Sequence, residues 1–260
     1  MNNRFCRLFM LMTCICAVSH WSDAKTPKPD KQTPEPSKPT AEPGKSTPEP
    51  GKQKEFISVQ RLVPRLYDGP NWTKEDKAVE QQHFIQFLDA TKSGQLILAG
   101  RTQEPGEKTL SIVVFRASDE AAARTFVKSD PLVSAGLINA ELHPFTLAVE
   151  NANPQLGNTK AFMYMLKLVP RLHDDNAWTK EDKDVVDRHF TRLKEAAKSG
   201  DLLLAGRTQE PGDKTFGIVI FSASDEAAAQ KFMETDPTVV AKLMTAELHP
   251  FTVHVRRKAQ

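Results

Sequence analysis

Cysteine is almost absent from this sequence, because its three copies, Cys6, Cys14 and Cys16, all lie close to the N-terminus. The rest of the chain can therefore form no disulfide and offers no thiolate to a metal. The sequence also lacks the phosphate-binding patterns GxGxxG and GxxxxGKS/T and the zinc-binding pattern HExxH. These absences argue against the common nucleotide-binding and zinc enzymes, and we expect no metal and no other cofactor.

Only one long apolar run is present, LFMLMTCICAV at residues 8–18, and it follows Arg4 and Arg7. A basic start, a short apolar run and small residues after it are typical of a signal peptide, which we place at residues 1–24. The run has 11 residues, fewer than the roughly 20 that a membrane-spanning helix needs. We therefore predict a periplasmic or secreted protein without a membrane span; a membrane anchor, or a lipoprotein processed at the LMTC sequence, is the alternative.

Residues 25–54 contain no aromatic and no branched apolar side chain, but they hold eight of the 18 prolines and seven lysines. Such a segment cannot build a core, and its composition is typical of a disordered, extended spacer. Attachment to an acidic cell-surface polymer or docking to a proline-binding module is the alternative. Because most of the excess positive charge lies in this segment, the remaining chain is slightly acidic and has no basic stripe. This argues against a nucleic-acid partner.

The nonapeptide LAGRTQEPG occurs at Leu98–Gly106 and again at Leu204–Gly212, 106 positions later. At the same offset, the blocks Arg61–Val149 and Lys167–Val255 agree at about three-fifths of their positions without a gap. The sequence therefore predicts two tandem domains, residues 55–150 and 161–257, joined by a linker at residues 151–160.

One repeat shows the pattern of a β-α-β-β-α-(α)-β unit. Its apolar and β-prone runs predict strands, and Thr73 and Ser118 are suited to begin helices. Pro105 and Gly106 suit the central positions of a type II turn, which predicts a hairpin. The first-repeat elements we expect are strands at 55–63, 95–102, 109–117 and 138–149, helices at 74–92 and 119–129, and a short helix after Asp130.

Two such units predict an α+β fold of the ferredoxin-like kind, an antiparallel sheet with helices on one face. The face of each sheet that carries no helices has to be buried or left exposed to water, and packing against the sheet of the other copy can bury it. A short tether raises the effective concentration of that partner to the order of millimolar. We therefore expect the two units to form an intramolecular dimeric α/β barrel, a pseudo-dimer within a monomeric chain.

Several short motifs, taken in order, make the repeats resemble the YCII-related (YciI-like) family. They are QHF or RHF, LAGRT, IVVF or IVIF, SDEAAA, an Asp-Pro pair before a turn of small residues, and AELHPF. The resemblance spans both repeats, about 190 of the 260 residues, but neither the signal nor the spacer. It implies ferredoxin-like units associated as dimeric α/β barrels, similar in fold to muconolactone isomerases and to a ring-dehydrochlorinating enzyme.

The resemblance also implies an active site with a histidine and an aspartate. By position these are His83 and Asp130 in the first repeat and His189 and Asp236 in the second. A histidine exchanges protons near neutral pH, and a neighbouring carboxylate orients it, which suits removal of a proton beside a carbonyl or carboxylate.

The chain departs from the family pattern at one place, because many members have Gly-Pro where this chain has Gly-Arg. The arginines, Arg101 and Arg207, add a cation to any pocket there, and we expect them to bind the carboxylate of a substrate. A surface bridge from Arg101 to Glu104 across the hairpin is the alternative.

Each candidate also has a structural alternative. His83 lies on the apolar face of its helix, where a hydrogen-bonded core histidine is common, and Asp130 before Pro131 suits a helix start. For His143, at a predicted strand end, we expect an exposed position or a contact between the repeats. Two functions follow as hypotheses: an exported enzyme of acid–base chemistry, such as isomerisation or elimination, or a non-catalytic module that binds a small anion or a partner protein.

Overall fold

A computed structural model of the chain describes residues 53–151, 154 and 160–258, all within one compact unit, Glu49–Gln260. The predicted signal peptide at residues 1–24, nearly all of the spacer and most of the linker lie outside the described residues.

The two repeats contain the same elements in the same order. The first comprises β1 (Lys54–Leu62), α1 (Lys74–Lys92), β2 (Leu96–Thr102), β3 (Ser111–Ala117), α2 (Glu120–Ser129), α3 (Pro131–Ser134) and β4 (Ile138–Glu150). The second comprises β5 (Lys160–Leu168), α4 (Lys180–Ser199), β6 (Leu202–Thr208), β7 (Phe216–Ala223), α5 (Glu226–Glu234), α6 (Pro237–Val240) and β8 (Met244–Arg256). The predicted element order is therefore confirmed in both copies.

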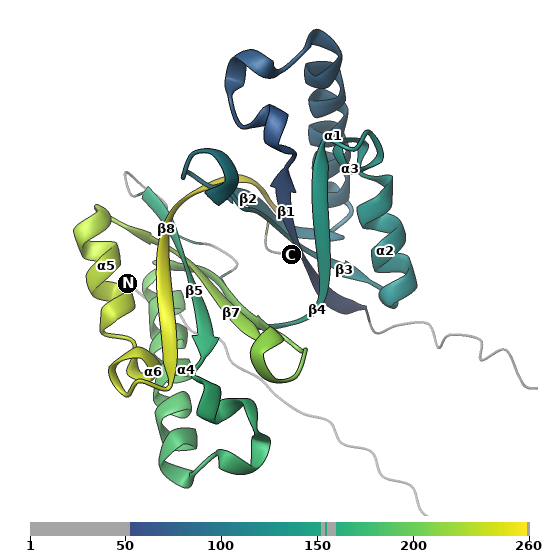
Figure 1. Ribbon diagram of the computed structural model, residues 1–260. Coiled ribbons are helices and arrows are strands. Elements are labelled where there is room, and N and C mark those ends of the chain that lie inside the picture. The colour runs from purple at the N-terminus through teal and green to yellow at the C-terminus, as the bar shows by residue number, and fades with distance from the viewer. Residues whose placement is uncertain (1–52, 152–153, 155–159, 259–260) are drawn as a thin grey trace, which may run out of the picture. The chain divides into compact units, whose positions relative to one another are not determined.

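The eight strands form one closed antiparallel barrel in the order β1-β3-β2-β8-β5-β7-β6-β4 (Figure 1). Each repeat contributes four neighbouring strands. The two sheets join along two seams, where β4 pairs with β6 and β8 pairs with β2. Closure leaves no sheet edge without a partner, so the expected barrel within one chain is confirmed.

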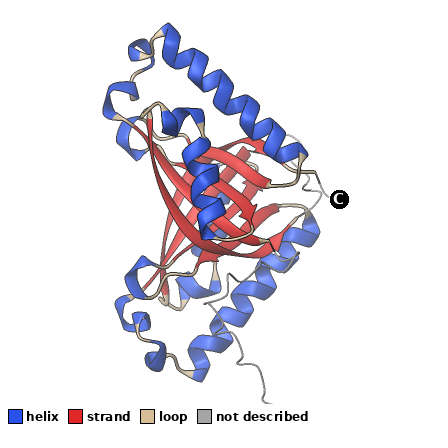
Figure 2. Ribbon diagram, turned by 90° about the vertical axis from the view of Figure 1, so that its right-hand side faces the viewer, coloured by secondary structure: helices blue, strands red, loops and turns tan. Residues whose placement is uncertain are grey.

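The barrel encloses a core that belongs to both repeats. Buried side chains of the first, such as Ile57 and Leu98, pack in one cluster with Met163 and Leu204 of the second. Figure 2 shows the helices outside the strands, on two sides of the barrel. Beneath them, each repeat has its own apolar cluster between helices and sheet.

The helix starts follow local sequence rules, with one correction. Thr73 and Asp76 form a reciprocal capping box at the start of α1, as expected for Thr73. The side chain that caps α2 is Asp119 and not Ser118, because its carboxylate accepts the amide of Ala122. A carboxylate also suits the positive end of the helix better than a hydroxyl does.

Gly100 and Gly206 permit the close approach of strands at the seams. A Cβ atom on Gly100 would lie 2.4 Å from the carbonyl oxygen of Thr252, and one on Gly206 would lie 2.4 Å from that of Thr146. Both seams also contain a β-bulge beside the glycine. A bulge adds one residue to a strand and redirects its side chain, a device common near functional sites.

Candidate functional site

In the first repeat, the predicted histidine and aspartate lie in hydrogen-bonding contact. His83 projects from α1, and its Nδ1 lies 2.7 Å from Oδ1 of Asp130. The same Oδ1 accepts the backbone amide of Leu132 at 2.9 Å, so Asp130 also caps α3 as the sequence indicated. The histidine ring packs on Phe87, with 4.1 Å between ring centroids.

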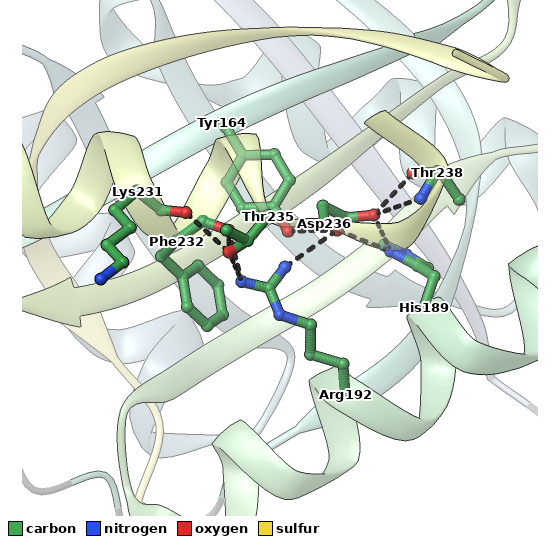
Figure 3. A network of polar contacts seen from close by, with 8 residues as sticks. All are labelled: Tyr164, His189, Arg192, Lys231, Phe232, Thr235, Asp236 and Thr238. Carbon is green, nitrogen blue, oxygen red and sulfur yellow. Dashed lines mark hydrogen bonds and ion pairs between the residues drawn. The ribbon is translucent and has the colours of Figure 1, made fainter. Parts of the chain in front are cut away.

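The second repeat repeats this pair with additional contacts, which Figure 3 shows. Nδ1 of His189 lies 2.9 and 2.7 Å from the two carboxylate oxygens of Asp236. Oδ1 of Asp236 also accepts the amide of Thr238 at 2.9 Å and its hydroxyl at 2.7 Å. Both members of the pair are buried.

Two further residues hold Asp236 from the opposite side (Figure 3). Tyr164 on β5 is fully buried and donates its hydroxyl hydrogen to Oδ2 at 2.8 Å. Arg192 on α4 lies 3.7 Å from the same oxygen and stacks on Phe232, 4.1 Å above the ring centroid. Asp236 is thus surrounded by donors.

The donors control the ionisation of Asp236. Burial alone would raise its pKa, but the hydrogen bond and charge of His189 and the hydrogen bonds of Thr238 lower it to about 2. Burial, followed by the neighbouring charge of Asp236, raises the pKa of Tyr164 well above its usual value. The site therefore pairs an ionised carboxylate with a neutral phenol.

The first repeat lacks all three additional donors. Ser58, Gln86 and Leu132 stand where the second repeat has Tyr164, Arg192 and Thr238. Among the described residues, the buried Oδ2 of Asp130 and the buried hydroxyl of Ser58 have no hydrogen-bond partner. The sequence analysis did not identify Tyr164, Arg192 or Thr238, although comparison of the two copies position by position would have revealed them.

Arg101 and Arg207, the predicted substrate-binding residues, are exposed, and neither has an ion pair or hydrogen bond in the part of the chain that the structure describes. The alternative contact of Arg101 with Glu104 is therefore wrong. Glu104 instead pairs with His249 on β8 at 2.7 Å, because the β2–β8 seam brings the two repeats together at this hairpin.

His143 makes the equivalent contact at the other seam. Its Nδ1 lies 2.6 Å from Oε1 of Glu210, which confirms the expected contact between repeats. Each hairpin glutamate thus joins a histidine of the other copy.

Two cavities lie at equivalent places in the repeats. The one in the second repeat has a volume of about 620 Å³, the one in the first about 450 Å³. The larger cavity includes His189 in its lining, whereas His83 does not line the smaller one. Among the lining side chains that the two share by position are Trp72, Lys77, Arg101 and Glu104 in the first repeat and Trp178, Lys183, Arg207 and Glu210 in the second.

Within the described residues, no three histidine, cysteine, aspartate or glutamate side chains converge as a metal site. None of the helices described there is long and apolar enough to cross a membrane.

The fold and the paired sites define a tandem ferredoxin-like α/β-barrel protein with one histidine–aspartate pair per repeat. The chain belongs to the YCII-related family: the YCII-related domain model matches residues 62–146 and residues 163–251. The predicted family and its tandem duplication are therefore confirmed. No curated protein matches the sequence.

Solved structures share the fold at very low sequence identity. A proposed monooxygenase from Lactobacillus acidophilus NCFM has a TM-score of 0.50 at 9% identity, covering 79% of this chain and 96% of its own. A second proposed monooxygenase, from Fusobacterium nucleatum, has a TM-score of 0.50 at 10% identity and covers 79% of this chain and 94% of its own. A chlorite dismutase variant from Candidatus Nitrospira defluvii has a TM-score of 0.50 at 9% identity and covers 78% of this chain and 93% of its own. At such identities the likeness extends to the fold alone.

Proposed function

We propose that this protein is an enzyme of acid–base chemistry on a small anionic molecule, an isomerisation or an elimination, and that the reaction takes place in the cavity of the second repeat. One observation carries the proposal: His189, oriented by an ionised aspartate, lines the same cavity as Arg207, which has no ion pair or hydrogen bond among the described residues. The volume of about 620 Å³ suits a small ligand.

The roles follow from the geometry. Because Asp236 is ionised, Nδ1 of His189 carries the hydrogen that it donates, which leaves the lone pair on Nε2. Nε2 has no hydrogen-bond partner in the described part of the chain, so it can accept a proton from a substrate carbon beside a carbonyl or carboxylate. Arg207 balances the substrate's negative charge. In an isomerisation the electron pair left on that carbon shifts the double bond, and Nε2 returns the proton to a different carbon. In an elimination the same pair forms a new double bond while the leaving group departs with the electrons of its own bond, and Nε2 passes the proton to the leaving group or to solvent.

The competing function is a non-catalytic module that binds a small anion, or a partner protein, without turnover. The many donors around Asp236 favour it, because a fully hydrogen-bonded buried carboxylate also stabilises a fold without taking part in chemistry. Under this alternative the first-repeat pair, His83 and Asp130, is equally structural.

Nuclear magnetic resonance of the imidazole signals, followed by turnover assays, tests the proposal. We expect the His189 signals to shift when small carboxylates or lactones are added, and one member of the set to be converted. His189→Gln should abolish conversion, and Arg207→Gln should raise KM more than it lowers kcat. Arg124→Gln, an exposed arginine on α2, is the matched control and should change neither.

Shifts of the His189 signals without turnover would contradict the enzyme function and favour the non-catalytic binding module. If the His189 signals neither titrate nor respond to any ligand, the His189–Asp236 pair is a structural contact of the core, and both functions are contradicted.

Export is a separate proposal. Its support is the sequence of residues 1–24, with a basic start followed by a short apolar run. Cell fractionation of the full chain tests it: recovery of a shortened protein outside the cytoplasm is expected, and uncleaved protein in the cytoplasm would contradict it.

A further inference from the structure

The two repeats have the same histidine, aspartate and arginine, yet of the two equivalent cavities only the one in the second repeat has the histidine in its lining. His189 lines the larger cavity together with Ala148 and Arg207, whereas the smaller cavity includes Arg101 but not His83. Burial of the histidine does not explain this, since the side chain of His83 is 16% exposed and that of His189 is 8% exposed. The difference is therefore the space beside the ring.

Some residues line the larger cavity although their counterparts do not line the smaller one, and these counterparts show what fills the space in the first repeat. At most of these positions the counterpart is similar in size or only slightly larger: Gln60 for Leu166, and Ser111 for Gly217. Two positions are enlarged. Phe87 replaces Leu193, and an imidazole, His254, replaces the methyl group of Ala148.

His254 and Ala148 are the bulge residues of the two seams. In the β2–β8 seam, Ala99 pairs with Val255 and Gly100 with Val253, which leaves His254 unpaired between them. In the β4–β6 seam, Ala148 holds the same position between Leu147 and Val149. The bulge directs the residue of one repeat toward the site of the other.

The electrostatic surroundings of His254 agree with this placement. His254 is an exposed residue, yet partial burial lowers the pKa of its imidazole, and the charges of Arg101 and His83 lower it further. His254 of the second repeat therefore lies close to both first-repeat residues, where the other seam has a cavity.

We propose that each chain has one ligand-binding site and not two, the cavity beside His189, and that His254 is the residue that removes the equivalent site beside His83. The inference deepens the proposed function and rests on its cavity. The lack of the three donors around Asp130 supports it independently, because a pair that binds no ligand needs less precise support.

The absence of cysteine after position 16 allows a test that needs no knowledge of the ligand. Ala205 lines the cavity of the second repeat, and Ala99 is its counterpart in the first. In the full chain, Ala205→Cys and Ala99→Cys each introduce one thiol beyond the signal segment, and both positions are alanines, so the two variants are matched. Methyl methanethiosulfonate is the probe, and mass spectrometry of the peptides measures the labelling rate.

Both alanines are buried, but Ala205 lines a cavity and Ala99 does not line the smaller one. We therefore expect the thiol at position 205 to be labelled about tenfold or more faster than that at position 99, which requires local opening. Adding His254→Ala should raise the rate at position 99 toward that at position 205, with Phe87 still packed on His83, and Ala148→His should lower the rate at position 205. His254→Ala changes an exposed residue, so it keeps the test valid even if Ala148→His fails to fold.

Equal labelling of the two thiols in the parent chain would overturn the single site. Labelling at position 99 that stays slow after His254→Ala would overturn the role of His254. Neither outcome depends on catalysis. If the labelling pattern is as expected but no substrate is converted, the single ligand-binding site still holds and only the enzyme function is contradicted.

Discussion

Tyr164 donates a hydrogen bond to Oδ2 of Asp236 over 2.8 Å, whereas Ser58, its counterpart in the first repeat, has a buried hydroxyl without a partner in the described part of the chain. The two repeats therefore form the same histidine–aspartate pair with different support. A homodimer of one repeat could not do this, because both copies would have the same sequence.

This difference predicts unequal effects of removing the two hydroxyls. Tyr164→Phe should lower the free energy of unfolding by about 2 kcal/mol, because a buried hydrogen bond to a charged group is lost and Oδ2 loses a donor. Ser58→Ala is the matched control and should stay within about 0.5 kcal/mol of the parent. Urea unfolding followed by fluorescence measures both. Similar losses for the two variants would contradict the stabilising role of Tyr164.

The seam glycines give a second prediction. Gly100→Ala should destabilise the protein by about 3 kcal/mol or prevent folding, because the added Cβ would lie 2.4 Å from a backbone oxygen of β8. Gly69→Ala, at a position with no atom within 4 Å of the added carbon, is the control. Thermal unfolding of the two variants should differ clearly, and a stable Gly100→Ala protein would refute the close approach at this seam.

The ionised carboxylates predict loss of stability in acid. The pKa of Asp236 is about 2 in the folded protein, below its value in an unfolded chain, so its contribution is present above about pH 4 and is lost as the pH falls toward about 2. The shift corresponds to roughly 2 kcal/mol. Hydrogen bonds from Arg65 and Arg171 lower the pKa of Asp76 and Asp182 in the same direction.

Urea unfolding at a series of pH values measures this dependence. Asp236→Asn should make the slope of unfolding free energy against pH shallower between about pH 2 and about pH 4. Asp89→Asn, at an exposed surface pair, should leave the slope unchanged. An unchanged slope in Asp236→Asn would mean that this carboxylate is not held ionised by its neighbours.

The pairs that cross between repeats predict a local effect. Glu104→Gln removes a charge that faces His249 across the β2–β8 seam, so amide hydrogen exchange in β2 should become faster while the far side of the barrel is unaffected. Glu107→Gln, on the same hairpin but exposed, is the control. Burial raises the pKa of Glu104, but its hydrogen bonds with Thr102 and His249 lower it overall, so the stabilisation should weaken as the pH falls below about 4.5.

Much of the fold could be predicted because its signals are local or repeated. Thr73 and Asp76 lie three positions apart and form the expected cap. The 106-residue repeat indicated two units, and two units with one open face each indicated the barrel. The helix start at Asp119 differed from the expected Ser118 by one residue, because adjacent serine and aspartate both suit a cap.

The environment of the site was less predictable, because its contacts join distant parts of the chain. Glu104 and His249 are 145 positions apart, and only the register of the seam shows that they meet. The alternative contact of Arg101 with Glu104 considered the hairpin alone. His254 was not identified for the same reason: its neighbours Arg101 and His83 belong to the other repeat.

The two seams also differ in the length of chain that each must close. Thr146 pairs with Arg207, about 60 positions away, but Arg101 pairs with Thr252, about 150 positions away. The longer closure carries the larger entropic cost and favours a later step in folding. Until that step, β2 and β8 present free edges, and the edges of two chains are complementary. At high protein concentration the last seam can therefore form between molecules, which makes exchanged dimers the characteristic misassembly of this barrel.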